Sequence, residues 1–380
     1  MSLVSSHSPT GQTPLRTVQV LGGGNAGSSA HVRSLALGLV ARGVRVTVCA
    51  PVEADHAYDF SGAGADHVHV PRSTDPTSVA MLREACKNAD LVHAHGLHAS
   101  FRAVLALSGR RTPLVVTWHD RAHAEGARAH LVRLLERQVV RAATVVLGTS
   151  SALVDRARGT GARDARLAAV APPLPQSRGN SKPDDVDPLR PKVRAELGVV
   201  DRPLLLAVGS LERHRGYHTL LDASRAWCRL DPVPLVAVAG EGPLRADLQR
   251  RIDDEELPVR LLGPRDDVAD LIAAADLALL PSRWEARSLF AQEALRARVP
   301  LVASDVGGIP ELVGDAAALV PYGDAVALAG TVVRLLGDPR RREELRDKGV
   351  RQAASWPTED ETVAQVLSVY DELTRHRPLM

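Results

Sequence analysis

The chain has 380 residues, which is too long for one ordinary domain and suits two domains of about 180 residues each. Hydrophobic residues make up 45% and charged residues 24%, as in a typical globular protein, and no run of 18 or more apolar residues predicts a transmembrane helix. The net charge of +2 divides into +8 over residues 1–180 and −6 over the rest, so only the first half is basic enough for a nucleic-acid partner.

The N-terminal residues 1–16 are polar and lack the apolar core of a secretory signal, so they predict a disordered tail. Three scattered cysteines (Cys49, Cys86 and Cys228) have no metal-ligand spacing, as expected of reduced thiols in a cytoplasmic protein. No aromatic residues alternate with the basic ones, so we expect no nucleic-acid partner. Salt-sensitive binding to generic DNA or RNA would indicate that rival class.

The first half alternates between strand and helix patterns. A β-branched run, Thr17–Leu21, stops at a glycine-rich turn, and Val32, Leu35 and Leu39 then recur on one helix face before a second strand at 44–49. This order opens a doubly wound parallel sheet. Further buried-strand runs stand at 91–94, 114–117 and 144–147, and right-handed crossovers place the turns after them at one edge of the sheet.

A stretch rich in Pro, Ser and Asp (172–191) interrupts this alternation, and we expect a linker over 176–200. The pattern then restarts with strands expected at 204–208, 235–239, 260–262, 277–280 and 301–303. The predicted fold class is therefore α/β, with a first Rossmann-like domain over 17–175 and a second over 201–357. A last helix within 358–380 is expected to cross back toward the first domain.

Charged residues follow several strands of the second half. Gly209 ends one strand, and the guanidinium groups of Arg213 and Arg215 follow it closely, where they could neutralise a diphosphate. Arg265 lies just past another strand and could stack on a base, although a solvated surface arginine is the simpler interpretation. Ligands bind at such strand ends, so a cleft between the domains is the expected site.

Two carboxylates flank the start of a predicted helix. Glu285 lies in the loop before it and Glu293 lies on its first turns, within the otherwise apolar segment Leu289–Leu295. An unpartnered carboxylate in such a segment is costly, which favours a functional role. The two are poorly placed to share a proton, so we interpret them as hydroxyl-binding groups with helix N-terminal amides between them, rather than as an acid and nucleophile pair.

The segment 127–143 predicts a basic amphipathic helix in which Leu131, Leu134 and Leu135 are interleaved with arginines. Two interpretations stay open. Its apolar face packs on the sheet, or it lies on an anionic membrane surface, which would make the protein peripheral at the inner face of the membrane.

The succession GSLERHRG, GEGP and EARSLFAQEALRARVPLVASDVGGIPEL resembles the retaining glycosyltransferases of the GT-B fold, specifically family 4 (glycosyl transferases group 1). The first-half segments GGGNAGSSAHVRSLALGLVARGVRVTV, LVHAHGLHAS, VVTWHD and VVLGTSSALVD resemble that family as well. The resemblance implies two Rossmann-like domains facing across a cleft. It also implies transfer of a hexose-type sugar from a nucleotide-diphosphate donor to a glycan, lipid-linked or small-molecule acceptor.

The resemblance also assigns roles to residues. Glu293 is expected to bind the ribose hydroxyls and Glu285 the donor sugar, and His119 is expected beside the transferred sugar. The diphosphate is expected at Arg213 and Arg215, at Gly209 and Ser210, at the amides of Ser288, Leu289 and Phe290, and at the turn of Gly27 and Ser28.

Two departures qualify this resemblance. Ser210 replaces the usual arginine at the diphosphate, and Arg213 could substitute for it; losing one electrostatic donor commonly costs about a hundredfold to a thousandfold in rate. Ala286, Arg287 and Ser288 replace the commoner Gly-Phe-Gly type of turn, which would reshape the sugar pocket.

No cofactor or metal is expected, because the only DxD triplet, residues 185–187, lies in the linker. Two rival functions remain: a nucleotide-sugar epimerase or hydrolase, and a non-catalytic sugar-nucleotide binder, which Ser210 favours.

Overall fold

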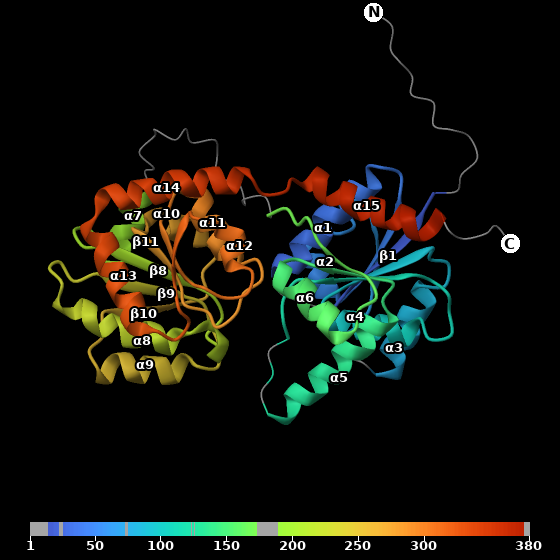
Figure 1. Ribbon diagram of the computed structural model, residues 1–380, viewed down its shortest axis with the longest axis horizontal. Coiled ribbons are helices and arrows are strands. Elements are labelled where there is room, and N and C mark those ends of the chain that lie inside the picture. Colours follow the sequence, from blue (N-terminus) through green and yellow to red (C-terminus); the bar gives the residue numbers. More distant parts are fainter. Residues whose placement is uncertain are drawn as a thin grey trace, which may run out of the picture.

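The computed structural model describes residues 14–22, 26–72, 75–122, 124, 126–172 and 189–375. It contains two α/β domains, each built on one parallel sheet (Figure 1). Helices and strands of the N-terminal domain are β1 (Arg16–Leu21), α1 (Ala26–Val40), β2 (Arg45–Ala50), α2 (Val52–Tyr58), β3 (Asp66–His69), α3 (Pro76–Ala85), β4 (Leu91–His95), α4 (Leu97–Ala106), β5 (Leu114–Trp118), α5 (Ala127–Ala142), β6 (Val145–Gly148), α6 (Ser151–Thr160) and β7 (Ala165–Leu167).

The C-terminal part continues with α7 (Leu189–Glu196), β8 (Leu204–Val208), the 3-10 turn η1 (Arg213–Arg215), α8 (Tyr217–Ser224), η2 (Arg225–Arg229), β9 (Leu235–Ala239), α9 (Arg245–Asp254), β10 (Val259–Gly263), α10 (Val268–Ala274), β11 (Leu277–Leu280), α11 (Leu289–Arg296), β12 (Leu301–Ser304), α12 (Ile309–Val313), β13 (Ala317–Val320), α13 (Ala325–Gly337), α14 (Pro339–Ala354) and α15 (Glu359–Arg375). Within the described residues, none of these helices is long and apolar enough to span a bilayer.

Both sheets have the doubly wound order that the strand and helix alternation predicts. The strands run β3-β2-β1-β4-β5-β6-β7 in the first sheet and β10-β9-β8-β11-β12-β13 in the second, and all pairs are parallel. The order reverses beside β1 and beside β8. Crevices at such reversals are where ligands bind in open α/β sheets.

The predicted strands are confirmed to within one residue at each end, but three edge strands were missed. β3, β7 and β13 are only three or four residues long. Both β3 and β7 contain charged or polar side chains, of which Asp66 and His69 are exposed and Arg166 is half-buried, so a search for buried apolar runs passes over these strands.

The structure corrects the second half of the expected linker. Residues 189–196 form α7, and Val193, Leu197 and Val199 are buried in the core of the C-terminal domain. Arg190 and Arg194 also pair with Asp276 at 2.9 and 3.0 Å. The arginine-rich composition concealed an amphipathic helix there. Residues 176–188 of the expected linker and residues 1–13 of the expected tail lie outside the described residues.

The C-terminal helix α15 leaves the second domain and lies across the first (Figure 1). Val363, Val366 and Tyr370 are buried in the core that contains β1 and α1. A Cβ added at Gly38 of α1 would lie 2.4 Å from the Val363 side chain, so the two helices pack closely. This helix therefore supplies side chains to the interior of the N-terminal domain.

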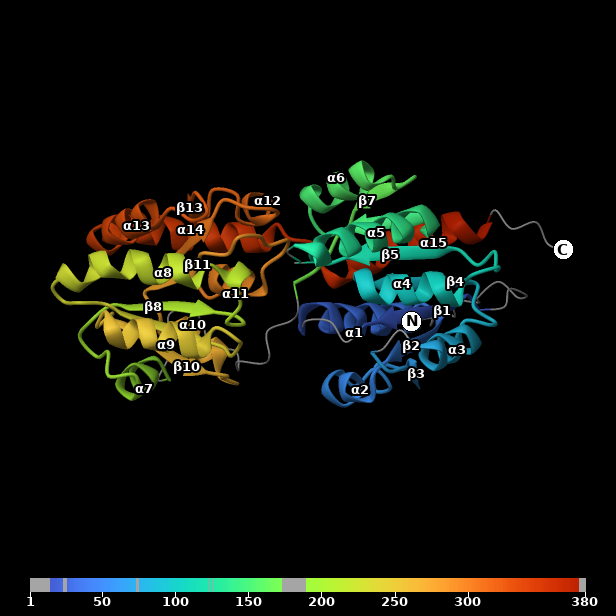
Figure 2. The same cartoon turned by 90° about the horizontal axis from the view of Figure 1, so that it is seen from below.

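The two domains meet where turns after the strands of each sheet come together. Gly308 packs on Ser150, and the Ser151 amide at the N-terminus of α6 donates to Glu311 of α12 at 2.9 Å. Figure 2 shows α12 and α6 facing each other across this boundary. Ala286, from the loop after β11, packs with the core of the N-terminal domain. Side chains from both domains can therefore act on one ligand.

Candidate functional site between the domains

An ion pair lies at the centre of the C-terminal half of the site. Glu285, in the loop between β11 and α11, is 7% exposed. Its Oε1 accepts from the Ser282 hydroxyl at 2.9 Å and pairs with Nη1 of Arg215, which follows β8. Sequence reasoning found both charged residues but missed Ser282. Among the described residues, both partners of this carboxylate contact Oε1 and none contacts Oε2.

The loop that carries Glu285 is held by a glycine turn. The Gly308 amide donates to the Glu285 carbonyl at 2.8 Å. At Gly307, where φ is +56°, a Cβ would lie 2.1 Å from the same carbonyl oxygen. No side chain fits there, so the glycine pair fixes the backbone position of Glu285.

The N-terminus of α11 follows directly. The Ser288 hydroxyl caps it by accepting from the Ala291 amide at 3.4 Å. The amides of Leu289 and Phe290 lie in the first turn, where the helix itself offers no acceptor. The partial positive charge of a helix N-terminus is suited to phosphate oxygens.

Glu293 lies one turn further along α11 and is partly buried. Burial raises the pKa of this carboxyl above its ordinary value, and nearby Arg296 opposes the rise. Glu293 therefore lies in the partly buried position that its apolar sequence neighbours predict.

The loop after β8 contains the other predicted phosphate-binding residues. The Gly209 carbonyl accepts from the Tyr217 hydroxyl at 3.0 Å, Ser210 is partly buried, and Arg213 is exposed in η1. Nε of Arg215 is buried and has no hydrogen-bond partner among the described residues. An unsatisfied cationic donor of this kind fits an anionic ligand.

Arg265, the predicted base-stacking residue, pairs with Asp267 through Nε–Oδ1 and Nη2–Oδ2 contacts of 2.7 and 2.5 Å. This bidentate pair fixes the guanidinium plane just past β10, apart from the Arg215–Glu285 pair.

The N-terminal half of the site is a histidine cluster at the ends of β4 and β5. His119 follows β5 and is hydrogen-bonded through Nε2 to Nδ1 of His95 at 3.2 Å. His31 of α1 stands edge-on to His119, with ring centroids 4.9 Å apart. In the same helix Gly27 is partly buried and Ser28 is buried, and α1 begins at Ala26, two residues before the predicted start.

The histidine cluster continues into the protein core. His95 Nε2 contacts Oε1 of Gln19 at 3.0 Å, and Nε2 of Gln19 donates to the Tyr370 hydroxyl at 3.0 Å. That hydroxyl lies 2.7 Å from Nδ1 of His93, whose Nε2 lies 2.7 Å from the hydroxyl of Thr117. Sequence reasoning missed this network, although alternating histidines on a buried strand were a visible signal.

Burial keeps the imidazoles of this cluster neutral. It lowers the pKa of His31 to about 4 and that of His93 to about 3. Burial also holds the pKa values of His95 and His119 well below the ordinary value, and the neighbouring histidines add to the effect.

Asp120 is a further residue that sequence reasoning missed. Burial raises its pKa to about 6 and the charge of Glu285 adds to this, whereas the Arg121 amide, donating at 2.7 Å, and the charge of Arg215 oppose it. The pKa of Asp120 therefore depends on the charges of the Arg215–Glu285 pair in the other domain. Its position directly after His119, at a strand end, was the available signal.

Three imidazoles of the site could hold a transition metal. His31, His95 and His119 each bring one ring nitrogen to within 4.8 Å of the others. The 3.2 Å contact between His95 and His119 needs a proton on one of the two facing nitrogens, however, and metal coordination needs both lone pairs. The DxD triplet at 185–187 lies outside the described residues.

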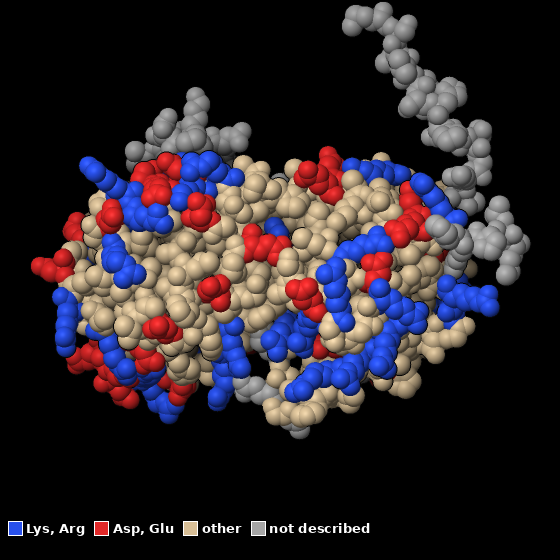
Figure 3. All heavy atoms as spheres, viewed as in Figure 1, with Lys and Arg blue, Asp and Glu red and all other residues tan. Residues whose placement is uncertain are grey.

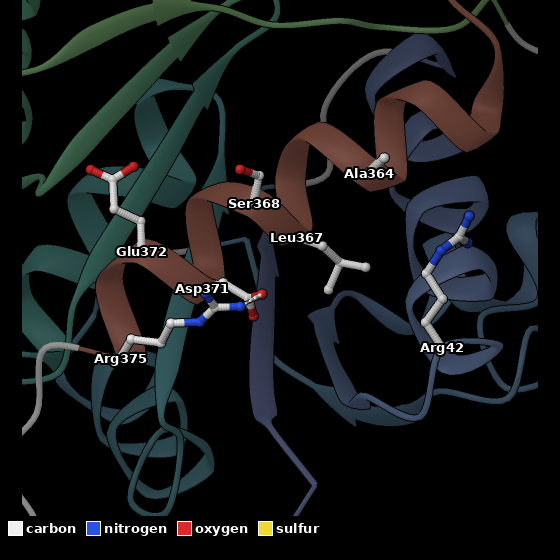
Figure 4. Close-up of a pocket in the computed structure, with 7 residues that line it drawn as sticks. All are labelled: Arg42, Ala364, Leu367, Ser368, Asp371, Glu372 and Arg375. Atoms are coloured by element: carbon white, nitrogen blue, oxygen red, sulfur yellow. Dashed lines mark hydrogen bonds and ion pairs between the residues drawn. The ribbon is translucent and has the colours of Figure 1, made fainter. Parts of the chain in front are cut away.

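Two surface pockets lie outside this site. One of about 620 Å³ lies between Arg42, in the turn after α1, and the outer face of α15, and is lined by Leu367, Glu372 and the paired Asp371 and Arg375 (Figure 4). It is remote from the strand ends and mixed in charge.

The second pocket, of about 400 Å³, is lined by Arg121, Arg133 and Arg156 together with small apolar residues. It begins one residue after Asp120. Figure 3 shows basic side chains gathered over α5 beside it.

The chain matches two family models, the glycosyl transferase 4-like domain over residues 26–173 and glycosyl transferases group 1 over residues 190–352. It is 29% identical to the alpha-D-kanosaminyltransferase of Streptomyces kanamyceticus over 74% of this chain and 77% of that protein. It is 30% identical to the D-inositol 3-phosphate glycosyltransferase of Salinispora arenicola over 77% of this chain and 71% of that protein.

A solved structure of HepE from Anabaena, in complex with UDP and glucose, matches with a TM-score of 0.78 and 19% identity, covering 94% of this chain and 100% of that one. The two domain-length matches follow one another in the family's order, and the structure has the fold that the family implies. This chain therefore belongs to the GT-B glycosyltransferases of family 4.

Proposed function

We propose that this glycosyltransferase moves a hexose-type sugar from a nucleotide-diphosphate donor to a hydroxyl acceptor with retention of the anomeric configuration. The observation that carries the proposal is the Arg215–Glu285 pair beside the N-terminus of α11, electrostatically coupled to Asp120 of the other domain, next to His119. The HepE structure with UDP and glucose supports a nucleotide-sugar donor of this kind.

In the proposed reaction the bond between the anomeric carbon and the donor phosphate breaks, and the acceptor oxygen bonds to that carbon from the same face. The leaving phosphate takes the acceptor proton, so the products are the glycoside and the nucleoside diphosphate. Arg215, through its unsatisfied Nε, and the amides at Ser288, Leu289 and Phe290 stabilise the developing charge. In this proposal Gly209 and Ser210 lie on one side of the phosphate, and Gly27 and Ser28 of α1 lie on the other.

Glu293 accepts hydrogen bonds from the ribose hydroxyls, and Glu285 accepts them from the hydroxyls of the donor sugar. His119 contacts the transferred sugar. Arg213 is exposed and could move toward the diphosphate where Ser210 provides no charge. Arg265 contributes by stacking on the base while Asp267 holds its plane.

Calorimetry with UDP-, GDP- and ADP-hexoses, followed by NMR of the product, tests this proposal. Wild-type protein should bind one of these donors, and the glycoside product should have the same anomeric configuration as the donor sugar. The Glu293→Ala variant should lose binding or turnover. An inverted product would overturn retention, and unchanged kinetics in the variant would overturn the role of Glu293. Free sugar or an epimer formed without acceptor would favour the rival enzyme class, and donor binding without turnover would favour a binder.

We also propose that transfer needs no metal, since Arg215 and the helix N-terminus supply the positive charge at phosphate. Dialysis against a chelator should leave kcat unchanged. A loss of activity that zinc or magnesium restores would contradict the proposal.

The acceptor, we propose, carries an anionic group that enters the pocket of Arg121, Arg133 and Arg156. Glu136 pairs with Arg156 at 2.7 Å and neutralises one of the three guanidinium charges. Among the described residues at the pocket, two positive charges are therefore left over. Burial lowers the pKa of Arg121, the charge of Arg156 adds to this, and Glu136 opposes it. The phosphate-bearing substrate named for the Salinispora relative is compatible with such a pocket.

Arg133→Gln should raise KM for a phosphorylated polyol about tenfold and leave KM for a neutral polyol unchanged. Arg137→Gln, on an exposed position of the same helix outside the pocket, is the control. An equal change in KM for the phosphorylated and the neutral polyol would contradict an anionic acceptor.

Finally, we propose a cytoplasmic protein that touches the inner face of an anionic membrane through α5. The C-terminal half of the helix packs inward through Val139 and Val140, whereas Leu131 and Leu134 are 57% and 56% exposed among basic residues. The Leu131→Ser and Leu134→Ser double variant should lose co-sedimentation with phosphatidylglycerol vesicles. Retained co-sedimentation would contradict a role for these leucines.

A further inference from the structure

The core of the N-terminal domain contains one continuous hydrogen-bonded chain from Thr117 to His119, formed by side chains of β1, β4, β5 and α15. Each member between them, His93, Tyr370, Gln19 and His95, is at most 4% exposed. Every link is between 2.7 and 3.2 Å. A buried polar network of this size is expensive unless every group is satisfied.

The protons along this chain are mutually dependent. The amide of Gln19 presents its oxygen to Nε2 of His95, so that nitrogen carries the hydrogen. Nδ1 of neutral His95 is then a bare acceptor, and the hydrogen in its contact with His119 belongs to Nε2 of His119. His119 is left with an unprotonated Nδ1.

The other end of the chain agrees with this direction. Nε2 of Gln19 donates to the Tyr370 oxygen, so the Tyr370 hydroxyl hydrogen is free to go to Nδ1 of His93. His93 then donates from Nε2 to the Thr117 hydroxyl. Reversing the Gln19 amide would reverse every proton and place the hydrogen of His119 on Nδ1. Since burial keeps these imidazoles neutral, the tautomer is what the network determines.

We propose that Gln19 and Tyr370 are positioning residues that fix His119 as the Nε2–H tautomer and thereby present its Nδ1 as a hydrogen-bond acceptor to a hydroxyl of the donor sugar. The last part rests on the proposed function of His119, whereas the tautomer itself does not. The C-terminal helix α15, which packs on the N-terminal domain, thus acts on the orientation of His119 through Tyr370.

The test uses the full chain labelled with ¹⁵N-histidine and long-range ¹H–¹⁵N correlation NMR, with His119 assigned from its loss in His119→Asn. Wild-type His119 should show a protonated Nε2 and a bare Nδ1. In Gln19→Met, His95 loses its acceptor, so His119 should shift toward the Nδ1–H form. Tyr370→Phe, which removes a single hydroxyl and frees the Gln19 amide to turn, should give a mixture of the two tautomers.

In the same variants kcat/KM for transfer should fall about tenfold, the loss expected when one good hydrogen bond to the substrate is removed. Gln365→Met is the matched control, because Gln365 of α15 also bonds across to the N-terminal domain, at Leu167 and Ala169, but lies outside the chain. It should leave both the tautomer and kcat/KM unchanged.

A wild-type His119 protonated on Nδ1 would overturn the proposal, as would a Gln19→Met variant with an unmoved tautomer. Stoichiometric zinc in the purified protein, lost in His95→Ala, would also overturn it, since metal binding would then set the protons. If the tautomer shifts but kcat/KM holds, the network is sound and the proposed contact of His119 with the sugar is wrong.

Discussion

Replacing Asp120 by Asn should stabilise the protein and weaken its function. The side chain stands at the end of β5, where burial raises the pKa of its carboxyl from an ordinary 3.8 to about 6. The charge of Glu285 contributes in the same direction, and Arg215 only partly offsets it. The folded protein therefore holds this carboxylate at an energetic cost that asparagine, with nearly the same shape, does not have.

The sign and size of this cost follow from linkage. Between pH 3.8 and about 6 the folded state keeps the proton that the unfolded state has released, so stability falls as pH rises through that window and is level above it. A separation of about two pH units corresponds to about 3 kcal/mol. Asp120→Asn should thus gain up to about 3 kcal/mol near pH 8 and roughly half of that near pH 5.

Urea denaturation followed by tryptophan fluorescence at both pH values measures this difference. The Arg121 amide, which donates to Oδ1 of Asp120 at 2.7 Å, keeps an acceptor in the asparagine variant, so local structure is preserved. A gain that does not change with pH, or a loss near pH 8, would refute the reasoning. If the stabilised variant also transfers sugar more slowly, the carboxylate of Asp120 contributes to activity at the expense of stability.

Other variants test the neighbouring parts of the site. Gly308→Ala should lower Tm and weaken donor binding, because its Cβ would lie 2.3 Å from the Ala286 carbonyl; Gly159→Ala, with no heavy atom within 4 Å, should not, and equal effects would contradict this. As the pH is lowered, donor affinity should begin to fall at a higher pH than an ordinary glutamate would give, because burial raises the pKa of Glu293. Calorimetry that shows no such loss in wild type, or the same loss in Glu293→Gln, would count against it. Glu311→Gln removes the charge at the N-terminus of α6, so small-angle scattering of the donor-free protein should give a larger radius of gyration, and an unchanged radius would show that the domains are held by other contacts.

The sequence was sufficient for those parts of the fold that depend on buried periodicity. Central strands such as Leu204–Val208 and Leu277–Leu280 are continuous apolar runs, which burial on both faces of a parallel sheet requires. Helix α7 was missed because its buried face has few apolar residues, and its charged partner, Asp276, lies about 80 positions away. No local pattern reveals that pairing.

The candidate site divides in the same way. Glu285 and Glu293 are recognisable because they share one loop and helix, where local sequence sets their spacing. The contacts around them are distant in sequence: Arg215 pairs with Glu285 across 70 positions. In the network behind His119, Gln19 bonds to Tyr370 across 351 positions. Such contacts exist only after the sheets have formed and α15 has packed.

The same reasoning explains why Ser210 carries less weight than its sequence suggests. A single missing arginine matters most if each phosphate charge needs its own side chain, but on the proposed function two other positive features also face the phosphate. Nε of Arg215 is buried without a hydrogen-bond partner in the described part of the chain, and the α11 N-terminus offers the Leu289 and Phe290 amides. These groups are fixed by packing before any ligand binds, and preorganised donors stabilise a developing charge without reorganisation. On the proposed function, these groups offset part of the positive charge that an arginine in place of Ser210 would supply.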